Sequence, residues 1–245
     1  MKNPWDFSGK TALVVGGSSG IGNAIAHGYK SHGAEVHVWG TRPVQDYATM
    51  EGSDLTGLHY TQMDVTDVPA VEAWRPPFEA LDILVCSQGT ARFKREEFKP
   101  TVARAVIEVN LVSLFTCTDK FYPMLKQSRG TVIIIGSTAA YHSTRGTPAY
   151  NASKTAVLGL VRTLGEAWGP DGIRVNGIAP GFVPTKLTKV TSEHPDRLKR
   201  HLDRIPMGRV GAVEDMAHVA LFLASPMASY ILGQTIPVDG GLILN

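Results

Sequence analysis

Short apolar segments recur along the chain and alternate with longer stretches whose apolar residues have helical spacing. The short segments are apolar on both faces and rich in Val and Ile, which is typical of strands that helices cover on both sides. Together they indicate about seven strands. The strongest segments are residues 11–16, 35–40, 81–86, 131–136 and 173–178, and two weaker ones are residues 58–64 and 234–239.

Helices are predicted for most of the stretches between these segments, namely residues 20–32, 101–127, 149–168 and 213–224. Residues 65–80 contain Pro69, Pro76 and Pro77, which leave room for only a short helix. Strands that alternate with helices form βαβ units, so the chain is predicted to be an α/β protein with a doubly wound, Rossmann-type parallel sheet. No repeat or Gly/Ser linker interrupts the pattern, and residues 1–245 are expected to form a single domain.

The composition of the chain serves mainly to exclude classes of partner and location. The 245 residues are 43% hydrophobic and 19% charged with a formal net charge of +2, which gives no electrostatic argument for nucleic-acid binding. The first residues do not resemble a signal peptide, and the chain is expected to be soluble and cytoplasmic, with no membrane partner. Cys86 and Cys117 lack a C-x-x-C spacing and are predicted to be reduced structural thiols.

The stretch VVGGSSGIG, residues 14–22, lies between the first expected strand and the first expected helix. Gly16 would permit a tight turn, Gly20 the close approach of a pyrophosphate, and Gly22 the packing of the helix near the strand. A phosphate would then lie at the helix N-terminus. The same residues also contain G-x-S-x-G with Ser18 at its centre, the pattern of a hydrolase nucleophile, or they form a purely structural turn.

A second group of residues decides between these alternatives. Ser137 ends an expected strand, and Tyr150 and Lys154 lie four residues apart on one face of an expected helix. A tyrosine is a poor base at neutral pH because its ordinary pKa is about 10, but a neighbouring ammonium group favours the phenolate. A nucleophilic Ser18 would need a downstream histidine on a loop. His201 and His218 are expected inside helices, and His142, between Ser137 and Tyr150, is expected to be a solvated or packed histidine like them.

In this order the motifs resemble those of the short-chain dehydrogenase/reductases, especially the ketoacyl-reductase-like branch. Asn110 in VNL, Pro180 with Gly181, and VDGG at 238–241 complete the resemblance, which spans essentially the whole chain. It implies the strand order 3-2-1-4-5-6-7 and a homotetramer assembled through the helices at 101–127 and 149–168. Two departures are Val15, where the family usually has threonine, and CSQG at 86–89, where it usually has NNAG.

The resemblance also implies a role for each of four catalytic residues. Tyr150 would donate or accept the proton, and Ser137 would position the reacting carbonyl or hydroxyl. Lys154 would lower the pKa of the tyrosine and bind the nicotinamide ribose, while Asn110 would hold a water in the proton relay. The implied cofactor-binding residues are Gly16, Ser18, Ser19, Gly20, Ile21, Gly22, Gly40, Thr41, Arg42, Asp64, Val65, Gly89, Tyr150, Lys154, Pro180, Gly181 and Val183.

The predicted function is NAD(P)-dependent hydride transfer between a secondary alcohol and a ketone of a small-molecule substrate. The alternative is a catalytically silent member of the same fold that binds a dinucleotide or has a regulatory role. No metal is expected in the chemistry, because Tyr150 and Ser137 would polarise the carbonyl and no ligand cluster is visible in the sequence.

The resemblance implies that residues 182–206, the segment after Pro180 and Gly181, form a lid over the substrate. The charged residues of this segment lean basic, which would suit an anionic substrate but equally describes a solvated helix face. The side chains expected nearest the substrate are Arg92, Tyr141, His142, Arg145 and Phe182.

The end of the second expected strand favours NADP(H) over NAD(H). Enzymes of this architecture that use NAD place an acidic side chain there, and this chain has Gly40. Thr41 and Arg42 follow and offer a hydroxyl and a guanidinium to a 2′-phosphate. Ser18 and Ser19 argue against this preference for NADP(H), because they occupy positions where many NADP-preferring relatives have a basic residue.

Overall fold

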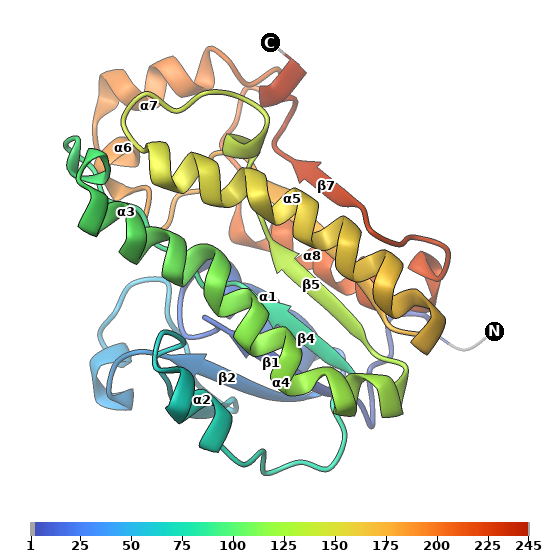
Figure 1. The fold of residues 1–245 in the computed structure, drawn as a ribbon. Coiled ribbons are helices and arrows are strands. Elements are labelled where there is room, and N and C mark those ends of the chain that lie inside the picture. Colours follow the sequence, from blue (N-terminus) through green and yellow to red (C-terminus); the bar gives the residue numbers. More distant parts are fainter. Residues whose placement is uncertain (1–2, 245) are drawn as a thin grey trace.

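The computed structural model describes residues 3–244, and for residues 190 and 191 it describes the backbone alone. Within this range, seven strands form one parallel sheet in the order β3-β2-β1-β4-β5-β6-β7 (Figure 1). The strands are β1 (Thr11–Val15), β2 (Glu35–Gly40), β3 (His59–Gln62), β4 (Ile83–Cys86), β5 (Thr131–Ile135), β6 (Arg174–Pro180) and β7 (Thr235–Val238). The predicted fold class and strand order are therefore confirmed.

Helices connect the strands and also extend beyond the carboxyl edge of the sheet. They are α1 (Gly20–Ser31), α2 (Val68–Ala73), α3 (Pro100–Ile107), α4 (Ser113–Ser128), α5 (Pro148–Trp168), α6 (Lys189–Ser192), α7 (Pro195–Leu202) and α8 (Val213–Ala224). Short helical turns occur at η1 (Val44–Tyr47), η2 (Glu96–Phe98), η3 (Glu108–Val112), η4 (Thr138–Ala140), η5 (Gly169–Asp171), η6 (Pro226–Ala228) and η7 (Leu242–Leu244). The segment predicted to form a lid, residues 182–206, contains α6 and α7.

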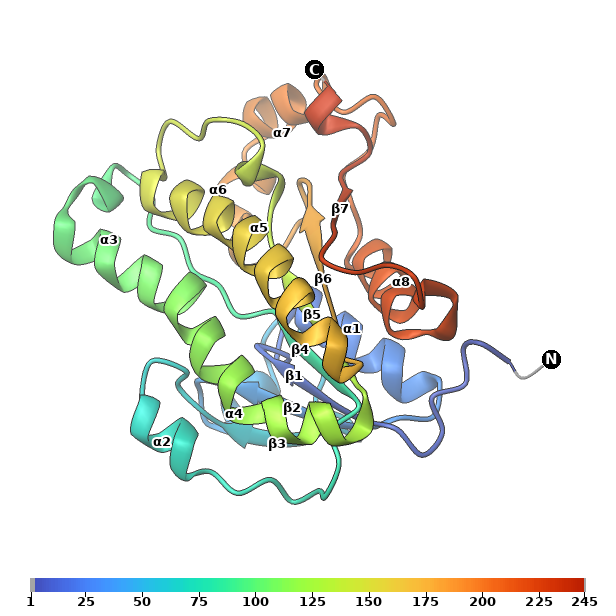
Figure 2. The ribbon, with the colours of Figure 1, turned by 45° about the vertical axis from the view of Figure 1, so that its right-hand side comes forward.

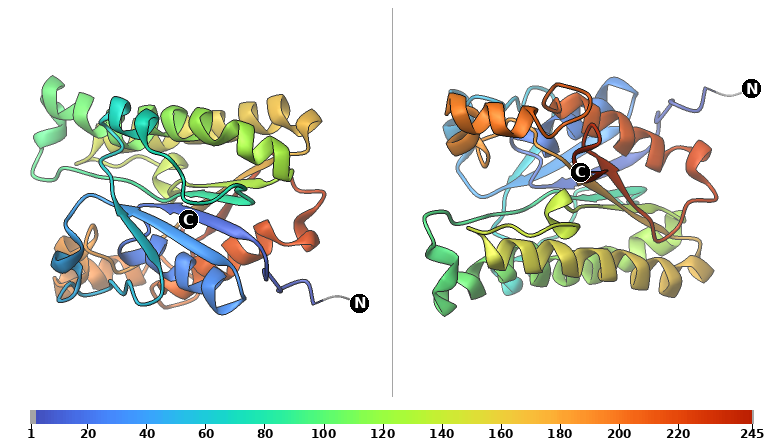
Figure 3. Two further views of the ribbon diagram at one scale, coloured as in Figure 1. Left: turned by 90° about the horizontal axis from the view of Figure 1, so that it is seen from below. Right: turned by 90° about the horizontal axis from the view of Figure 1, so that it is seen from above.

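The sheet lies between two layers of helices, seen edge-on in Figure 3. On one face, α1 and α8 cover a core that includes Ile25, Tyr29 and Leu221. On the other, α2, α4 and α5 cover a core built around Trp39 and Phe121. Burial of apolar side chains on both faces explains why the strands read as continuous apolar runs.

The parallel register brings several loops to one edge of the sheet. Val15 at the end of β1 pairs with Cys86 of β4, and Cys86 pairs with Ile134 of β5. The strand order reverses between β1 and β4, and ligands of open α/β sheets bind at such a switch point. The helix α7 lies beyond these carboxyl ends (Figure 2).

The α3, η3 and α4 elements form one continuous helix from Pro100 to Ser128 that is apolar and long enough to cross a membrane by length and composition alone. A share of 33% of its most apolar window is buried inside the fold, and Phe121 and Leu125 are fully buried against the sheet. Phe115 remains 53% exposed, so the helix has a second apolar side that this chain does not cover.

Candidate active site

The glycine loop makes the turn that its sequence predicts. Gly16 has a φ of +76°, which favours glycine, and a Cβ there would lie 2.8 Å from the backbone nitrogen of Gln88. A Cβ on Gly22 would overlap the carbonyl oxygen of Gly16. Ser19 is the N-cap of α1 but forms no side-chain capping bond, which leaves the helix N-terminus suited to an anion.

Ser18 is buried in this loop rather than presented as a nucleophile. Its side chain is packed so closely against the backbone of β2 that a Cβ on Gly40 would lie 2.5 Å from Ser18 Oγ. A nucleophile elbow instead needs its hydroxyl exposed above the sheet. The burial of Ser18 argues against the hydrolase alternative.

Ser137, Tyr150 and Lys154 meet at the carboxyl end of β5. Ser137 directly precedes η4, and its side chain forms a hydrogen bond with Tyr150. Lys154 follows Tyr150 by one helical turn, with its Nζ atom 5.9 Å from the centre of the tyrosine ring. Lys154 is 4% exposed and donates to the carbonyl oxygen of Ile135 at 2.7 Å. The fold therefore brings the three predicted catalytic side chains together.

The electrostatics of this group differ from the simple expectation. Burial raises the pKa of Tyr150 above its ordinary value, the hydrogen bond with Ser137 opposes this increase, and the charge of Glu97 adds to it. Burial lowers the pKa of Lys154 to about 8. The phenol of the protein without ligand is therefore held protonated, and a lowering of its pKa by Lys154 stays a prediction for the complex with cofactor.

Asn110 is fully buried and tied to its neighbours by its carboxamide. Oδ1 accepts from the backbone nitrogen of Thr90 at 2.7 Å, while Nδ2 donates to the Thr90 carbonyl at 2.9 Å and to Ser153 Oγ at 3.1 Å. Asn110 lies in η3, a π-helical turn that widens the helix at this point. Its side chain fixes the turn after β4 against α5, and the water-holding role stays a prediction.

The two departures from the family pattern are accommodated by packing. Val15 is fully buried in the same core as Cys86. Gln88 replaces the smaller residue of the usual pattern, and its Nε2 donates to Ser113 Oγ at 3.0 Å. Cys86 and Cys117 are both buried free thiols, as predicted. The altered residues pack at the adjacent ends of β1 and β4, and the Oε1 atom of Gln88 is buried without a hydrogen-bond partner among the described residues.

Gly89 lies beside Asn110 and Lys154 of the candidate catalytic group. A Cβ built on Gly89 would be 3.7 Å from both Asn110 Oδ1 and Lys154 Nζ, so the absent side chain leaves the approach to these atoms open. With the uncapped N-terminus of α1, this cradle fits a nicotinamide dinucleotide laid across the carboxyl ends of the strands.

The backbone on the adenine side is held by tyrosine hydroxyls. The Arg42 backbone nitrogen donates to Tyr47 OH at 3.3 Å, and Tyr60 OH donates to the carbonyl oxygen of Gly40 at 3.0 Å. The Arg42 side chain is exposed. Asp64 is also exposed, and its Oδ1 accepts from Thr66. These contacts fix the strand end while leaving the predicted phosphate-binding guanidinium free to reach a ligand.

Thr185 is a site residue that the sequence interpretation missed. A Cβ on Gly20 would lie 3.4 Å from Thr185 Cγ2, so this threonine packs directly on the glycine loop. Its position four residues after Gly181 is the signal that could have found it. Further along the chain, Lys189 of α6 bonds Glu51 at 2.7 Å and connects the lid to the segment after β2.

The residues predicted near the substrate differ in exposure. Arg92, Tyr141 and Arg145 are exposed, His142 is half-buried and Phe182 is buried. The Phe182 ring stacks on the His201 ring, with centroids 4.6 Å apart and an interplanar angle of 13°. Burial is the main cause that lowers the pKa of His201, and the charges of two arginines and of His142 add to it. His201, which was expected to be a solvated or packed histidine, thus packs against the first residue of the segment predicted to form the lid.

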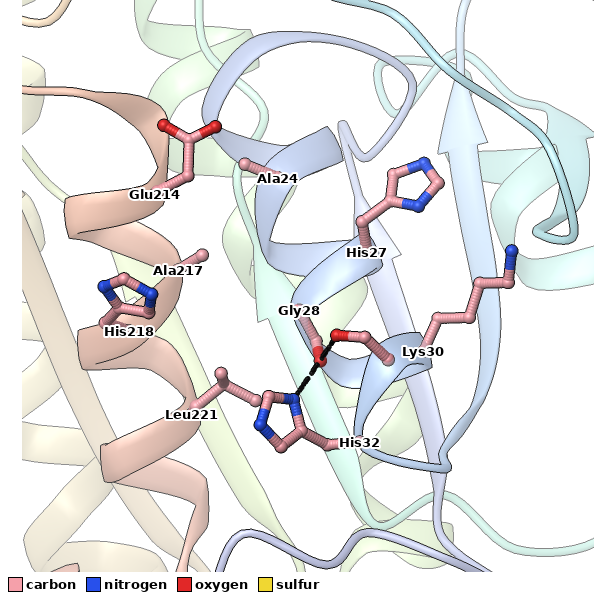
Figure 4. Close-up of a pocket in the computed structure, with 10 residues that line it drawn as sticks. Ala24, His27, Gly28, Lys30, His32, Glu214, Ala217, His218 and Leu221 are labelled. Carbon is pink, nitrogen blue, oxygen red and sulfur yellow. Dashed lines mark hydrogen bonds between the residues drawn. The ribbon is translucent and has the colours of Figure 1, made fainter.

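A surface groove of about 510 Å³ lies between α1 and α8, lined by His27, His32 and His218 among others (Figure 4). His32 Nδ1 bonds the carbonyl oxygen of Gly28 at 2.8 Å. The groove is flanked by helix side chains and contains none of the catalytic group, so it is distinct from the active site.

The sheet also assembles a histidine cluster that no local pattern revealed. The potential ligand atoms of Glu35, His37 and His59 lie within 4.8 Å of one another on β2 and β3. The two imidazole rings are stacked at 4.6 Å with an interplanar angle of 21°. Nitrogens of nearly parallel rings do not converge on one point, and His37 Nε2 already bonds Glu35 at 2.8 Å. This geometry favours a packed histidine pair over a metal centre.

Comparisons with known proteins agree with this geometry. A family profile described as enoyl-(acyl carrier protein) reductase matches residues 15–243. The chain belongs to the short-chain dehydrogenase/reductase family, and it is an NAD(P)-dependent oxidoreductase acting on CH–OH groups. The oxidoreductase interpretation is thereby confirmed, and nothing supports the silent alternative.

Individual relatives cover nearly the whole chain. The chain is 37% identical to a 3-oxoacyl-(acyl-carrier-protein) reductase FabG of Chlamydia muridarum, over 95% of this chain and 97% of that protein. It is 36% identical to a 2-dehydro-3-deoxy-D-gluconate 5-dehydrogenase of Bacillus subtilis, over 98% and 97%. A putative 2-deoxy-D-gluconate 3-dehydrogenase from Agrobacterium tumefaciens, solved with bound NADP, has a TM-score of 0.88 and 35% identity, with both chains covered completely.

Proposed function

We propose that the enzyme interconverts a secondary alcohol and a ketone on a small polar substrate, with Tyr150 as the general acid and base. The observation that carries this proposal is the hydrogen bond between Ser137 and Tyr150 beside the buried Nζ of Lys154. A nicotinamide cofactor, when bound, supplies or accepts the hydride.

In the reductive direction, the Tyr150 hydroxyl donates its proton to the carbonyl oxygen of the substrate. Ser137 donates a hydrogen bond to the same oxygen and aligns it with the phenol. Lys154 lies close enough to stabilise the phenolate left behind, since an ammonium group favours the charged form of a neighbouring acid. Oxidation of the alcohol uses the same groups with the proton moving back to Tyr150.

Residues around the glycine loop would hold the cofactor. The uncapped N-terminus of α1 suits the pyrophosphate, and Lys154 beside Gly89 suits the ribose on the nicotinamide side. We favour NADP(H) because β2 ends in Gly40 rather than in an acidic residue and Arg42 is exposed beside it. The bound NADP of the structural relative supports this preference.

Exposed cationic side chains near the candidate active site indicate the class of substrate. Arg92 extends from the loop after β4, and α7 carries Arg197, Lys199 and Arg200 over the same edge. This charge suits an anionic substrate such as a sugar acid or an acyl chain on a phosphorylated carrier. Relatives named for gluconate derivatives and for 3-oxoacyl carriers belong to these two classes.

A substrate panel tests the proposal directly. Sugar acids, neutral polyols, steroids, 3-oxoacyl thioesters and aryl ketones would be assayed with NADP(H) and NAD(H) by nicotinamide absorbance. We expect turnover with an anionic alcohol or ketone and with NADP(H) as the better cofactor. Ester hydrolysis without any nicotinamide, or no turnover with the whole panel, would overturn the proposal.

We propose further that the enzyme is a cytoplasmic homotetramer in which residues 182–206 close over the substrate. The exposed Phe115 and Val112 on the outer side of the Pro100–Ser128 helix support a helix-to-helix contact between subunits. Light scattering at micromolar concentration should give four times the mass of one chain, and a monomeric mass would contradict this assembly.

A further inference from the structure

Glu97 is a buried carboxylate that contacts the catalytic helix from another segment. It is 2% exposed and lies in η2, after the loop that follows β4. Its Oε2 accepts from the backbone nitrogen of Tyr150 at 2.8 Å, and its Oε1 accepts from the backbone nitrogen of Arg92 at 2.8 Å. One side chain therefore joins the acid/base residue to the residue expected beside the substrate.

The bond with Tyr150 satisfies a specific need of α5. Tyr150 lies in the first turn of the helix, where backbone N–H groups have no partner within the helix. The N-cap residue Thr147 forms no side-chain capping bond. Glu97 provides a cap in its place, and its negative charge is favourable at the positive end of the helix dipole.

The backbone before Glu97 is bent to place it there. Lys94 and Arg95 have φ values of +55° and +64°, a left-handed conformation that side chains other than glycine rarely adopt. Two such residues in succession are strained, and strain of this kind persists where the surrounding contacts enforce it. Here the turn directs the Glu97 carboxylate back toward Tyr150 and away from solvent.

The second hydrogen bond of Glu97, from the Arg92 backbone nitrogen, holds the loop that is expected to lie near the substrate. With its backbone nitrogen bound to Glu97, Arg92 turns its guanidinium to the Ala91 carbonyl, at 3.2 Å, and to Thr90. Thr90 is in turn held by Asn110. The chain of contacts runs from the predicted substrate-binding cation through Glu97 to the phenol-bearing residue.

We propose that Glu97 is a positioning residue that fixes Arg92 and Tyr150 relative to each other by accepting from both backbone nitrogens. This inference rests on the proposed role of Tyr150. It is supported by the pKa of Tyr150, which the charge of Glu97 raises. Glu97 thereby favours the protonated phenol, the form that donates to a carbonyl.

The test compares Glu97→Gln and Glu97→Asp with the matched control Glu96→Gln. Gln keeps the size of the side chain but loses the charge and turns an N–H donor toward one of the two backbone amides. Asp keeps the charge but is shorter. Glu96 is the neighbouring glutamate, with a side chain that is 46% exposed and bonded to Lys99, and it makes no contact with Tyr150 in the described structure.

The decisive measurement is the pH profile of kcat for the alcohol that the wild type oxidises fastest in the panel. The charged groups that face Tyr150 in the described structure are Lys154 on α5 and Glu97 in η2, and the neutral hydroxyl of Ser137 forms a hydrogen bond with it. Oxidation accelerates as Tyr150 loses its proton, so removal of the Glu97 charge should move this rise to lower pH by at least half a unit, about threefold in proton concentration.

We expect Glu97→Gln to reduce kcat/KM for the substrate at least tenfold with little change in the Kd of NADPH. Glu97→Asp should lose kcat while keeping the wild-type pH profile, and Glu96→Gln should match the wild type in both. If the pH profile of kcat for Glu97→Gln were identical to that of the wild type, the inference would be overturned. This holds if kcat is unchanged, and it also holds if kcat and Tm fall together, because a purely structural residue would give that result.

Hydrogen exchange gives a readout that does not require turnover. Peptides containing Arg92 and Tyr150 should both exchange faster in Glu97→Gln, or in Glu97→Asp if the glutamine variant does not fold, and not in Glu96→Gln. Unchanged exchange at both amides would overturn the inference. If the wild type turned over nothing in the panel, the proposed function would fail, while exchange would still report whether Glu97 joins the two segments.

Discussion

The Nζ atom of Lys154 lies 5.9 Å from the centre of the Tyr150 ring and donates to the carbonyl oxygen of Ile135 at 2.7 Å. This anchoring bond holds the cation at the end of β5, the strand that Ser137 follows. The cation is thus positioned by the sheet as well as by its own helix.

The buried lysine predicts how activity depends on pH. Burial lowers the pKa of Lys154 to about 8, so its ammonium form prevails below that pH and declines above it. Carbonyl reduction needs a protonated phenol and a cation to stabilise the product phenolate, and we expect kcat for reduction to fall as the pH rises through about 8. Because Lys154 and Tyr150 interact, the inflection belongs to the pair.

Lys154→Met tests this assignment, since Met keeps an apolar stem without the charge. We expect kcat to fall at least about 100-fold, within the range of proton-transfer contributions, and the inflection near pH 8 to disappear. Lys126→Met, which removes a surface cation paired with Asp171, serves as the control. An unchanged inflection in Lys154→Met would show that another group titrates there.

The glycine loop makes a steric prediction. A Cβ on Gly22 would overlap the Gly16 carbonyl oxygen, and backbone cannot yield as a flexible side chain can. Gly22→Ala should lower the free energy of unfolding by about 1 to 3 kcal/mol and weaken NADPH binding, because α1 must move away from β1.

Urea unfolding and fluorescence titration measure the two effects. Gly146→Ala is the matched control, since Gly146 is exposed and a Cβ there meets nothing within 4 Å. Its unfolding free energy should stay within about 0.5 kcal/mol of the wild type. Equal behaviour of the two variants would contradict the proposed packing of α1 on the loop.

An acidic residue outside the site provides a test of stability. Arg209 and the backbone nitrogen of Ala212 hold the pKa of Asp215 at about 2, against an ordinary value of 3.8. A lowered carboxyl pKa contributes stability that is complete above about pH 4 and is lost as the pH falls through about 2. Because the Arg209 side chain is 53% exposed, the contribution is discounted for solvent to about 1 kcal/mol.

Asp215→Asn should therefore lower the urea midpoint at pH 7, and the difference from the wild type should shrink to about half at pH 3. Denaturation at both pH values measures this. A difference that stays constant with pH would mean that the charge of Asp215 does not contribute.

Cofactor preference is tested at Arg42. Its guanidinium is exposed beside the end of β2, where a 2′-phosphate would lie, and a lost charge-assisted hydrogen bond costs about 1.5 to 3 kcal/mol. We expect Arg42→Ala to raise the Kd of NADP(H) at least about tenfold and to leave that of NAD(H) little changed. An equal effect on both cofactors, or a wild type that prefers NAD(H), would reject the assignment.

The elements that the sequence predicted well are those set by local pattern. The α8 helix has the predicted bounds, Val213–Ala224, and the prolines of residues 65–80 do limit α2 to Val68–Ala73. The long helix from Pro100 to Ser128 was also predicted, but its π turn at Asn110 was not. A π turn widens the backbone over only a few residues, and the apolar spacing around it changes too little to show this.

The features that the sequence did not predict arise from contacts between segments that are distant in the sequence. Glu97 follows another glutamate in the sequence, and nothing local distinguishes the exposed Glu96 from the buried Glu97 that caps α5. Likewise, His37 and His59 become neighbours only through the parallel register of β2 and β3. The sequence motifs predicted the candidate catalytic side chains, whereas the groups that hold these side chains in place depended on the fold.

The most direct test of the account is Tyr150→Phe, which removes one hydroxyl and keeps the aromatic ring in its packing. Turnover of the best substrate and the Kd of NADPH would be measured on the same preparation. The account predicts a kcat reduced by about 10² to 10⁴, the usual contribution of a general acid, with a Kd within about threefold of the wild type. Turnover close to that of the wild type would contradict the assignment of Tyr150 as the acid/base.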